Sequence, residues 1–196
     1  KEKMSKSLGN FITIKEALGS NSPEVLRYFL ISSHYRSPLN YSDKSIDEAR
    51  NSLDRLYNSI KDLNYKEIDF TKGEYTERFH NAMQDDFNTP SAISILFEMA
   101  KEINFFKKEK KSEDANALAS ELYNLSKILG ILEESPEKYF QTGISFSDEE
   151  IQDLISKRNE ARSNKDFKLS DKIRDHLLDK GITLEDKDTG TIWRKT

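Results

Sequence analysis

Ser42 to Leu63, with the sequence SDKSIDEARNSLDRLYNSIKDL, is the stretch that decides the fold class. Its apolar residues recur in steps of three and four, the spacing that puts side chains on one face of an α-helix. Charged and polar residues fill the other positions. The stretch therefore predicts a long bundle helix with an inward stripe of Ile46, Ala49, Leu53, Leu56, Ile60 and Leu63.

Three further helices with the same period follow. One begins between Thr71 and Glu74 and stops at the junction Asp-Asp-Phe-Asn-Thr-Pro of residues 85–90, where Thr89 can serve as N-cap and Pro90 as the first helical residue of the next. Another opens at Ser112 and stops at Gly130. Their stripes are Tyr75, Phe79 and Met83, then Ile93, Leu96, Phe97, Ala100 and Ile103, then Ala115, Leu118, Leu122, Leu125 and Leu129.

Two short helices precede this bundle. Thr13 and Glu16 have the spacing of a capping box, and Gly19 is expected to end that helix. Ser22 before Pro23 caps a second helix, whose predicted apolar face is Val25, Leu26, Phe29 and Leu30.

The C-terminal end has a different pattern. After a linker near residues 141–145, one helix runs to about Ser163 and another ends at Gly181. The hydrophobic period then changes to two, with a turn before Gly190, which predicts a β-hairpin. The fold class is therefore mainly α: a helical bundle followed by a small α+β module of two helices and a β-hairpin.

Composition excludes several classes. The 196 residues contain no cysteine, so disulfides and thiolate metal sites are excluded, and the three histidines show no ligand spacing, so no metal site is predicted. No apolar run is long enough to span a membrane, and we expect a cytoplasmic protein. Net charge is −4, but residues 151–196 hold eleven Lys/Arg against nine Asp/Glu, a mild bias toward a polyanion.

The first ten residues, KEKMSKSLGN, form a short cationic segment. Lys3 and Lys6 can place ammonium groups on phosphate oxygens, Ser5 and Ser7 can donate hydroxyl hydrogen bonds, and Gly9 permits close backbone approach. Such a loop suits a polyphosphate. The alternative is a solvated chain terminus.

Lys3-Met-Ser-Lys-Ser7 resembles the KMSKS signature of class I aminoacyl-tRNA synthetases, and the 85–90 junction resembles that of the helical DALR domain that follows their catalytic domain. These blocks, together with the helix and loop from Arg27 to Ser42 and the closing pattern from Gly181 to Arg194, look like the cysteinyl-tRNA synthetases of bacterial type. The resemblance covers Lys3 to about Lys195.

The resemblance implies four parts: residues 1–20 as the KMSKS loop and end of the catalytic domain, 21–65 as a stem-contact-like connector, 66–142 as a DALR-like bundle, and 143–196 as an anticodon-reading module. It implies activation of cysteine by ATP with Mg, followed by transfer to tRNA(Cys). Lys6 and Lys3 would be the catalytic residues, with Ser5 and Ser7 also binding ATP.

The resemblance also implies a nucleotide-binding Rossmann domain and a zinc site for the cysteine thiol ahead of Lys1. The chain does not begin with methionine, and we expect it to be the back half of a larger, monomeric enzyme and to be inactive alone.

For tRNA binding the candidates divide between one loop and the C-terminal module. Arg36, beside Tyr35, could clamp the RNA backbone, although a docked tyrosine and a surface arginine explain the pair more simply. Base reading by hydrogen bonds and stacking favours residues of the module. These are Arg162, Phe167, Asp171, Asp186 and Trp193, and Arg194 is a candidate for phosphate contact.

Simpler explanations exist for several of these residues. Asp171 could pair with Arg174 or Lys172 on its own helix, and Trp193 is better explained as hairpin core than as a stacking platform. The family often has tryptophan where Phe167 stands. The charge run from Lys107 to Lys111 is most simply an inter-helix turn, with RNA contact as the alternative.

Three other functions fit the sequence less well. A stand-alone tRNA-binding or partner-binding module descended from a synthetase would need no KMSKS loop. A cysteine ligase acting on an amino sugar would lack the C-terminal module, and another class I synthetase would share the loop but not the ending.

Overall fold

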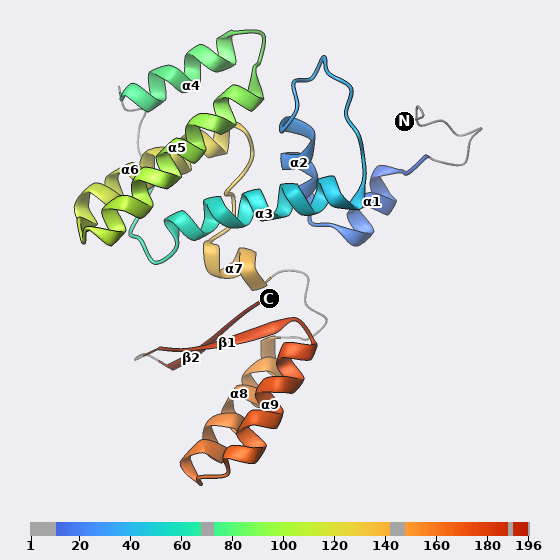
Figure 1. The fold of residues 1–196 in the computed structure, drawn as a ribbon, viewed down its shortest axis with the longest axis vertical. Coiled ribbons are helices and arrows are strands. Elements are labelled where there is room, and N and C mark those ends of the chain that lie inside the picture. Colours follow the sequence, from blue (N-terminus) through green and yellow to red (C-terminus); the bar gives the residue numbers. More distant parts are fainter. Residues whose placement is uncertain (1–10, 68–72, 142–147, 188–189, 196) are drawn as a thin grey trace. The chain divides into compact units, whose positions relative to one another are not determined.

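The computed structural model describes residues 11–67, 73–141, 148–187 and 190–195. It has two compact units, Lys1–Pro136 and Glu137–Thr196, and each is described by itself (Figure 1). Helices dominate both units, and the sheet is a two-stranded antiparallel pair. The predicted fold class, mainly α with a small α+β module, is confirmed. Within the described residues, no helix is both long and apolar enough to cross a membrane.

The first unit opens with helices α1 (Ile14–Ser20) and α2 (Pro23–Ile31). The capping box of Thr13 and Glu16 is present, and Ser22 caps α2 with Pro23 as its first residue. The predicted end of α1 at Gly19 was wrong by one residue, because the helix runs through Ser20.

Helix α3 (Asp43–Ile60) is the long bundle helix predicted from its periodicity, and Ser42 caps it. It packs against α2 and α5. Five of its six predicted inward residues are buried, namely Ile46, Ala49, Leu53, Leu56 and Ile60. The stripe works because burial of each large apolar side chain stabilises the fold by about 1.5–3 kcal/mol.

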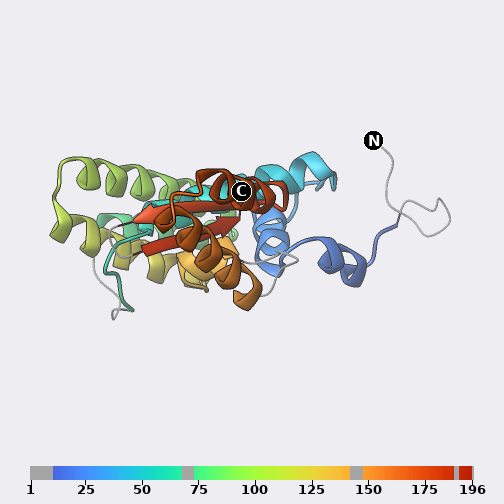
Figure 2. The same ribbon diagram turned by 90° about the horizontal axis from the view of Figure 1, so that it is seen from below.

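Helices α4 (Glu74–Gln84), α5 (Thr89–Lys108) and α6 (Ser112–Ile128) complete the bundle. The two views agree that α5 and α6 run side by side (Figures 1 and 2). The prediction that Thr89 caps α5 was wrong. Asn88 is the cap, because its side chain accepts the Ser91 backbone N–H at 3.1 Å, and Thr89 begins the helix.

The second unit consists of α8 (Asp148–Ser163), α9 (Phe167–Asp179) and a hairpin of β1 (Ile182–Lys187) and β2 (Gly190–Lys195), with the short α7 (Pro136–Gln141) before them. Helix α8 packs on α9, and α9 packs on β1. The register pairs Leu184 with Trp193 and Asp186 with Thr191. A compact apolar core joins helices and hairpin: Ile151, Ile155, Leu177, Ile182 and Trp193.

Candidate nucleic-acid interface

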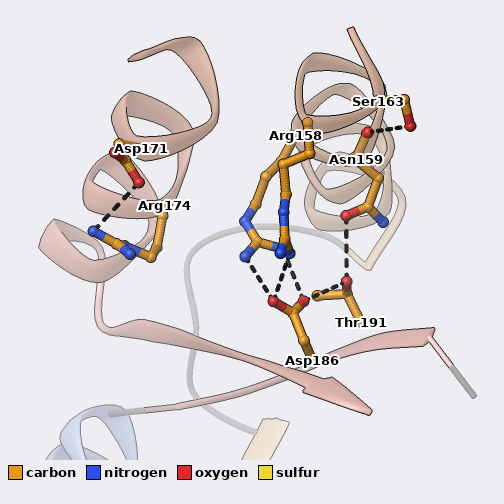
Figure 3. A network of polar contacts seen from close by, with 8 residues as sticks. Arg158, Asn159, Ser163, Asp171, Arg174, Asp186 and Thr191 are labelled. Carbon is orange, nitrogen blue, oxygen red and sulfur yellow. Dashed lines mark hydrogen bonds and ion pairs between the residues drawn. The ribbon is translucent and has the colours of Figure 1, made fainter. Parts of the chain in front are cut away.

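A carboxylate on the hairpin holds two arginines of α8 in the second unit (Figure 3). Asp186 accepts hydrogen bonds from both terminal nitrogens of Arg158, each at 2.9 Å, and from one terminal nitrogen of Arg162 at 2.7 Å. Thr191, directly across the hairpin, donates its hydroxyl to Asp186 at 2.8 Å and lies 3.3 Å from the amide oxygen of Asn159. We call Arg158, Arg162, Asp186 and Thr191 the carboxylate cluster.

Local geometry explains why these groups meet. Arg158 and Arg162 are four residues apart, so they lie on the same face of α8. Asp186 and Thr191 are cross-strand partners, whose side chains share one face of the hairpin. Packing α8 and α9 together, and α9 on β1, brings the helix face to the hairpin.

The two arginines differ in their surroundings. The side chain of Arg158 is only 8% exposed, whereas those of Arg162 and Asp186 are 47% and 45% exposed. Hydrogen bonding to Arg158, then to Thr191 and Arg162, holds the pKa of Asp186 well below its usual range. The same bond raises the pKa of Arg158. Asp186 is therefore ionised near neutral pH, and the two arginines give the cluster one more positive than negative charge.

The other candidate residues of this unit are placed separately. Phe167 is the first residue of α9 and is exposed, and Asp171 is an exposed residue on the same helix. Asp171 lies 3.6 Å from Arg174, in the loose i,i+3 ion pair that the sequence offered as its simpler explanation (Figure 3). A pair this long and this exposed holds Asp171 weakly, so its carboxylate is accessible to a base edge.

The hairpin's closing residues have distinct places. Trp193 is 6% exposed and belongs to the apolar core, as the packing explanation expected. Its ring is covered, which favours a role in the core over the alternative of stacking on a base. Arg194 pairs with Thr183 through the strand register, and its side chain lies outside the described residues.

In the first unit, Tyr35 and Arg36 converge on the junction before α5. The Tyr35 hydroxyl donates to Asp86 at 2.7 Å, and the Arg36 guanidinium donates to both carboxylate oxygens of Asp86 at 2.8 and 3.2 Å. These bonds, chiefly that from Arg36, lower the pKa of Asp86. Sequence reasoning assigned this junction no role beyond a helix boundary, yet its Asp86 carboxylate orients the candidate Arg36, which is itself well exposed.

Lys107, the first residue of the charge run from Lys107 to Lys111, has a structural role that the sequence did not indicate. Its ammonium group donates to the backbone carbonyls of Asn58, Ser59 and Lys61 at 3.0–3.3 Å and so caps the end of α3. Cations at a helix C-terminus interact favourably with its unpaired carbonyls. Burial lowers the pKa of Lys107, and its three carbonyl partners favour a structural role over RNA contact.

The KMSKS residues Lys3, Ser5, Lys6 and Ser7 lie outside the described residues. Arg158 and Thr191 were missed by sequence reasoning. Two signals could have indicated them: the four-residue spacing of Arg158 and Arg162, and the position of Thr191 opposite Asp186 across a predicted turn.

Three family models match separate parts of the chain. Residues 1–51 match the tRNA synthetases class I (C) catalytic domain, 78–133 match the DALR domain, and 147–194 match the cysteinyl-tRNA ligase anticodon binding domain. The carboxylate cluster lies inside the last of these ranges. The chain thus has the anticodon-binding domains of a class I aminoacyl-tRNA synthetase.

Matches to named proteins show which kind of class I synthetase the chain is similar to. The chain is 51% identical to a cysteine--tRNA ligase of Hahella chejuensis, 50% to one of Coxiella burnetii and 49% to one of Haemophilus influenzae. Each match covers 100% of this chain but only 42–44% of the relative. The chain corresponds to the C-terminal region of the cysteine--tRNA ligases, and the predicted resemblance is confirmed.

Proposed function

We propose that this chain is the tRNA-recognising part of an enzyme that activates cysteine with ATP and transfers it to tRNA(Cys). The chain would supply the KMSKS loop and read the anticodon. The observation that carries the proposal is the carboxylate cluster, in which the exposed Arg162 lies beside a second, buried arginine within the range that matches an anticodon binding domain.

The proposed contacts follow from exposure and chemistry. Arg162 and Asp171 present a donor fork and an acceptor to base edges, and Phe167 presents a flat ring for stacking. Arg194, and Arg36 in the first unit, would contact the RNA backbone. Asp186 takes part through its bonds to the two arginines.

The ATP chemistry is proposed for the loop. Lys6 and Lys3 would stabilise the charge that builds on the phosphates, with Ser5, Ser7 and Mg assisting. Zinc would bind the thiol of the cysteine substrate in the full enzyme. This chain contains no cysteine residue and so offers no thiolate ligand for the metal. We expect a cytoplasmic monomer.

Binding of the 196-residue chain to tRNA(Cys) transcripts tests the anticodon role. One transcript carries the native anticodon, and others change one anticodon base each. We expect each changed base to weaken binding by about 1–3 kcal/mol, the range of a bidentate base contact. Equal affinity for all transcripts, at one fixed salt concentration, would contradict anticodon reading.

The loop is tested in the full-length enzyme. Lys6→Ala should slow adenylate formation far more than it weakens tRNA binding, since the loop's interactions are proposed to strengthen in the transition state. Lys15→Ala, an exposed lysine of α1, is the matched control. Normal adenylate formation by Lys6→Ala would remove Lys6 from catalysis.

A further inference from the structure

We propose that Arg158 is a positioning residue for anticodon reading, which fixes the Asp186 carboxylate so that the neighbouring Arg162 is presented to the RNA. The inference rests on the proposed function of the module. It assigns different roles to two arginines that share one carboxylate. Arg158 holds the carboxylate in place, and Arg162 contacts the anticodon.

The geometry separates the two roles. Arg158 spans Asp186 with a fork of two hydrogen bonds, one to each carboxylate oxygen. Such bidentate pairs fix orientation as well as charge. Arg162 makes a single bond to one of these oxygens and is about half exposed. Its remaining N–H donors are therefore available to a second acceptor while the bond to Asp186 keeps the guanidinium beside the carboxylate.

Hydrogen-bond donors occupy all the acceptor sites of the Asp186 carboxylate. One oxygen of Asp186 accepts from Arg158 and Thr191, and the other accepts from Arg158 and Arg162. A carboxylate has about four lone-pair sites, so four donors saturate it. Asp186 can accept a bond from a base only by releasing one of these donors, and the exposed Arg162 is the one that RNA can reach. In either case Arg158 keeps the carboxylate in place.

Stability alone does not explain a buried arginine here. Taking Arg158 out of water is costly, and its Nε atom is buried without a hydrogen-bond partner among the described residues. The cost of taking a charged partner out of water can exceed the attraction of its ion pair, and here only the Arg158 partner is buried. Asp171 of α9 adds an attractive charge, but at a distance rather than by contact. Orientation of Asp186 and Arg162 is the role that this arrangement serves.

The test compares Arg158→Met, Arg158→Lys and Arg162→Gln in the 196-residue chain. For each protein, affinity is measured for the native tRNA(Cys) transcript and for transcripts with one changed anticodon base. Far-UV circular dichroism and the fluorescence of Trp193, the single tryptophan, report folding. Arg78→Gln, in an exposed ion pair with Glu98 of the first unit, is the matched control.

For Arg158→Met we expect a folded protein whose preference for the native anticodon falls about tenfold, one lost base contact. Arg158→Lys should recover part of the preference, since lysine restores the charge but not the fork. Arg162→Gln should lose the preference as well, as expected when a base-reading arginine is removed. Arg78→Gln should behave as wild type.

The outcomes separate this inference from the proposed function. If the wild-type chain prefers the native anticodon and the folded Arg158→Met variant keeps that preference, the positioning role is wrong and anticodon reading stands. If Arg158→Met does not fold, the folded Arg158→Lys variant decides: an unchanged preference overturns the inference. If the wild-type chain shows no preference, both proposals fail.

Discussion

The Tyr57 hydroxyl of α3 donates to the Glu24 carboxylate of α2 at 2.8 Å. Tyr57 is fully buried, and the backbone N–H of Leu132 also donates to Glu24. One carboxylate thus joins α2, α3 and the segment after α6 within the first unit. The bond is charge-assisted, which makes it stronger than a neutral one.

Tyr57→Phe removes that hydroxyl while keeping the ring. We expect the first unit to lose about 1.5–3 kcal/mol of unfolding free energy, the usual range for a hydrogen bond to a charged group. Urea unfolding followed by far-UV circular dichroism measures the loss. Tyr123→Phe, a half-buried tyrosine whose ring packs on Tyr65, is the matched control. Equal effects of the two substitutions would show that the bond to Glu24 has no special weight.

Glu24 also predicts a pH dependence. Burial raises its pKa above the ordinary 4.5, although its hydrogen bonds partly oppose the shift. A carboxyl group with a raised folded pKa binds its proton more tightly in the folded state, so its contribution to stability is lost as pH rises from about 4.5 through the folded pKa. Relative to Glu24→Gln, the wild-type chain should therefore lose stability across that interval. A difference that stays flat with pH would contradict it.

Sequence periodicity predicted the bundle well because the three-and-four spacing is a local property. Leu53, Leu56 and Ile60 are fully buried, as their spacing required. Leu30 was placed on the apolar face of α2 but is 60% exposed, and Tyr28 is buried in its place. Which side of a short helix is covered depends on its neighbours, and the sequence of the helix alone does not contain that information.

The carboxylate cluster, too, could be predicted from the sequence only in part. Arg162 and Asp186 were singled out from the residue types able to read bases, and the structure brings them together. Arg158 was not, because its pairing with Asp186 depends on a contact between α8 and a hairpin 28 residues away. The bonding of Arg36 to Asp86 was missed for a similar reason, since it joins positions 50 residues apart.

Two glycines give opposite predictions for substitution by alanine. Gly130 has a φ of +65°, and an added Cβ would lie 2.3 Å from a terminal nitrogen of Arg27, whose guanidinium donates to the Gly130 carbonyl. Gly130→Ala should cost at least about 1–2 kcal/mol from the left-handed backbone alone. Gly19, inside α1, has open space around it, and Gly19→Ala should stabilise by about 0.5–1 kcal/mol.

Thermal unfolding of both glycine variants measures this contrast. It would be contradicted by a Gly130→Ala protein as stable as wild type. Arg27→Met together with Gly130→Ala separates the two causes, since the double variant removes the clash with the guanidinium but keeps the backbone strain.

Asp186 predicts an acid-sensitive second unit. Its pKa is depressed, chiefly by Arg158, so its contribution to stability is present above about 3.8, the ordinary value, and is lost as pH falls toward the folded pKa. Asp186→Asn should therefore be less stable than wild type at pH 7, where it leaves Arg158 buried without its counter-charge, and the difference should shrink as pH falls below about 4. Urea unfolding followed by Trp193 fluorescence reports this unit, since that indole lies in its core. Asp171→Asn, in a loose exposed pair, is the control and should change little. A constant difference between wild type and Asp186→Asn from pH 7 to pH 3 would mean that the carboxylate's charge does not hold the hairpin to α8.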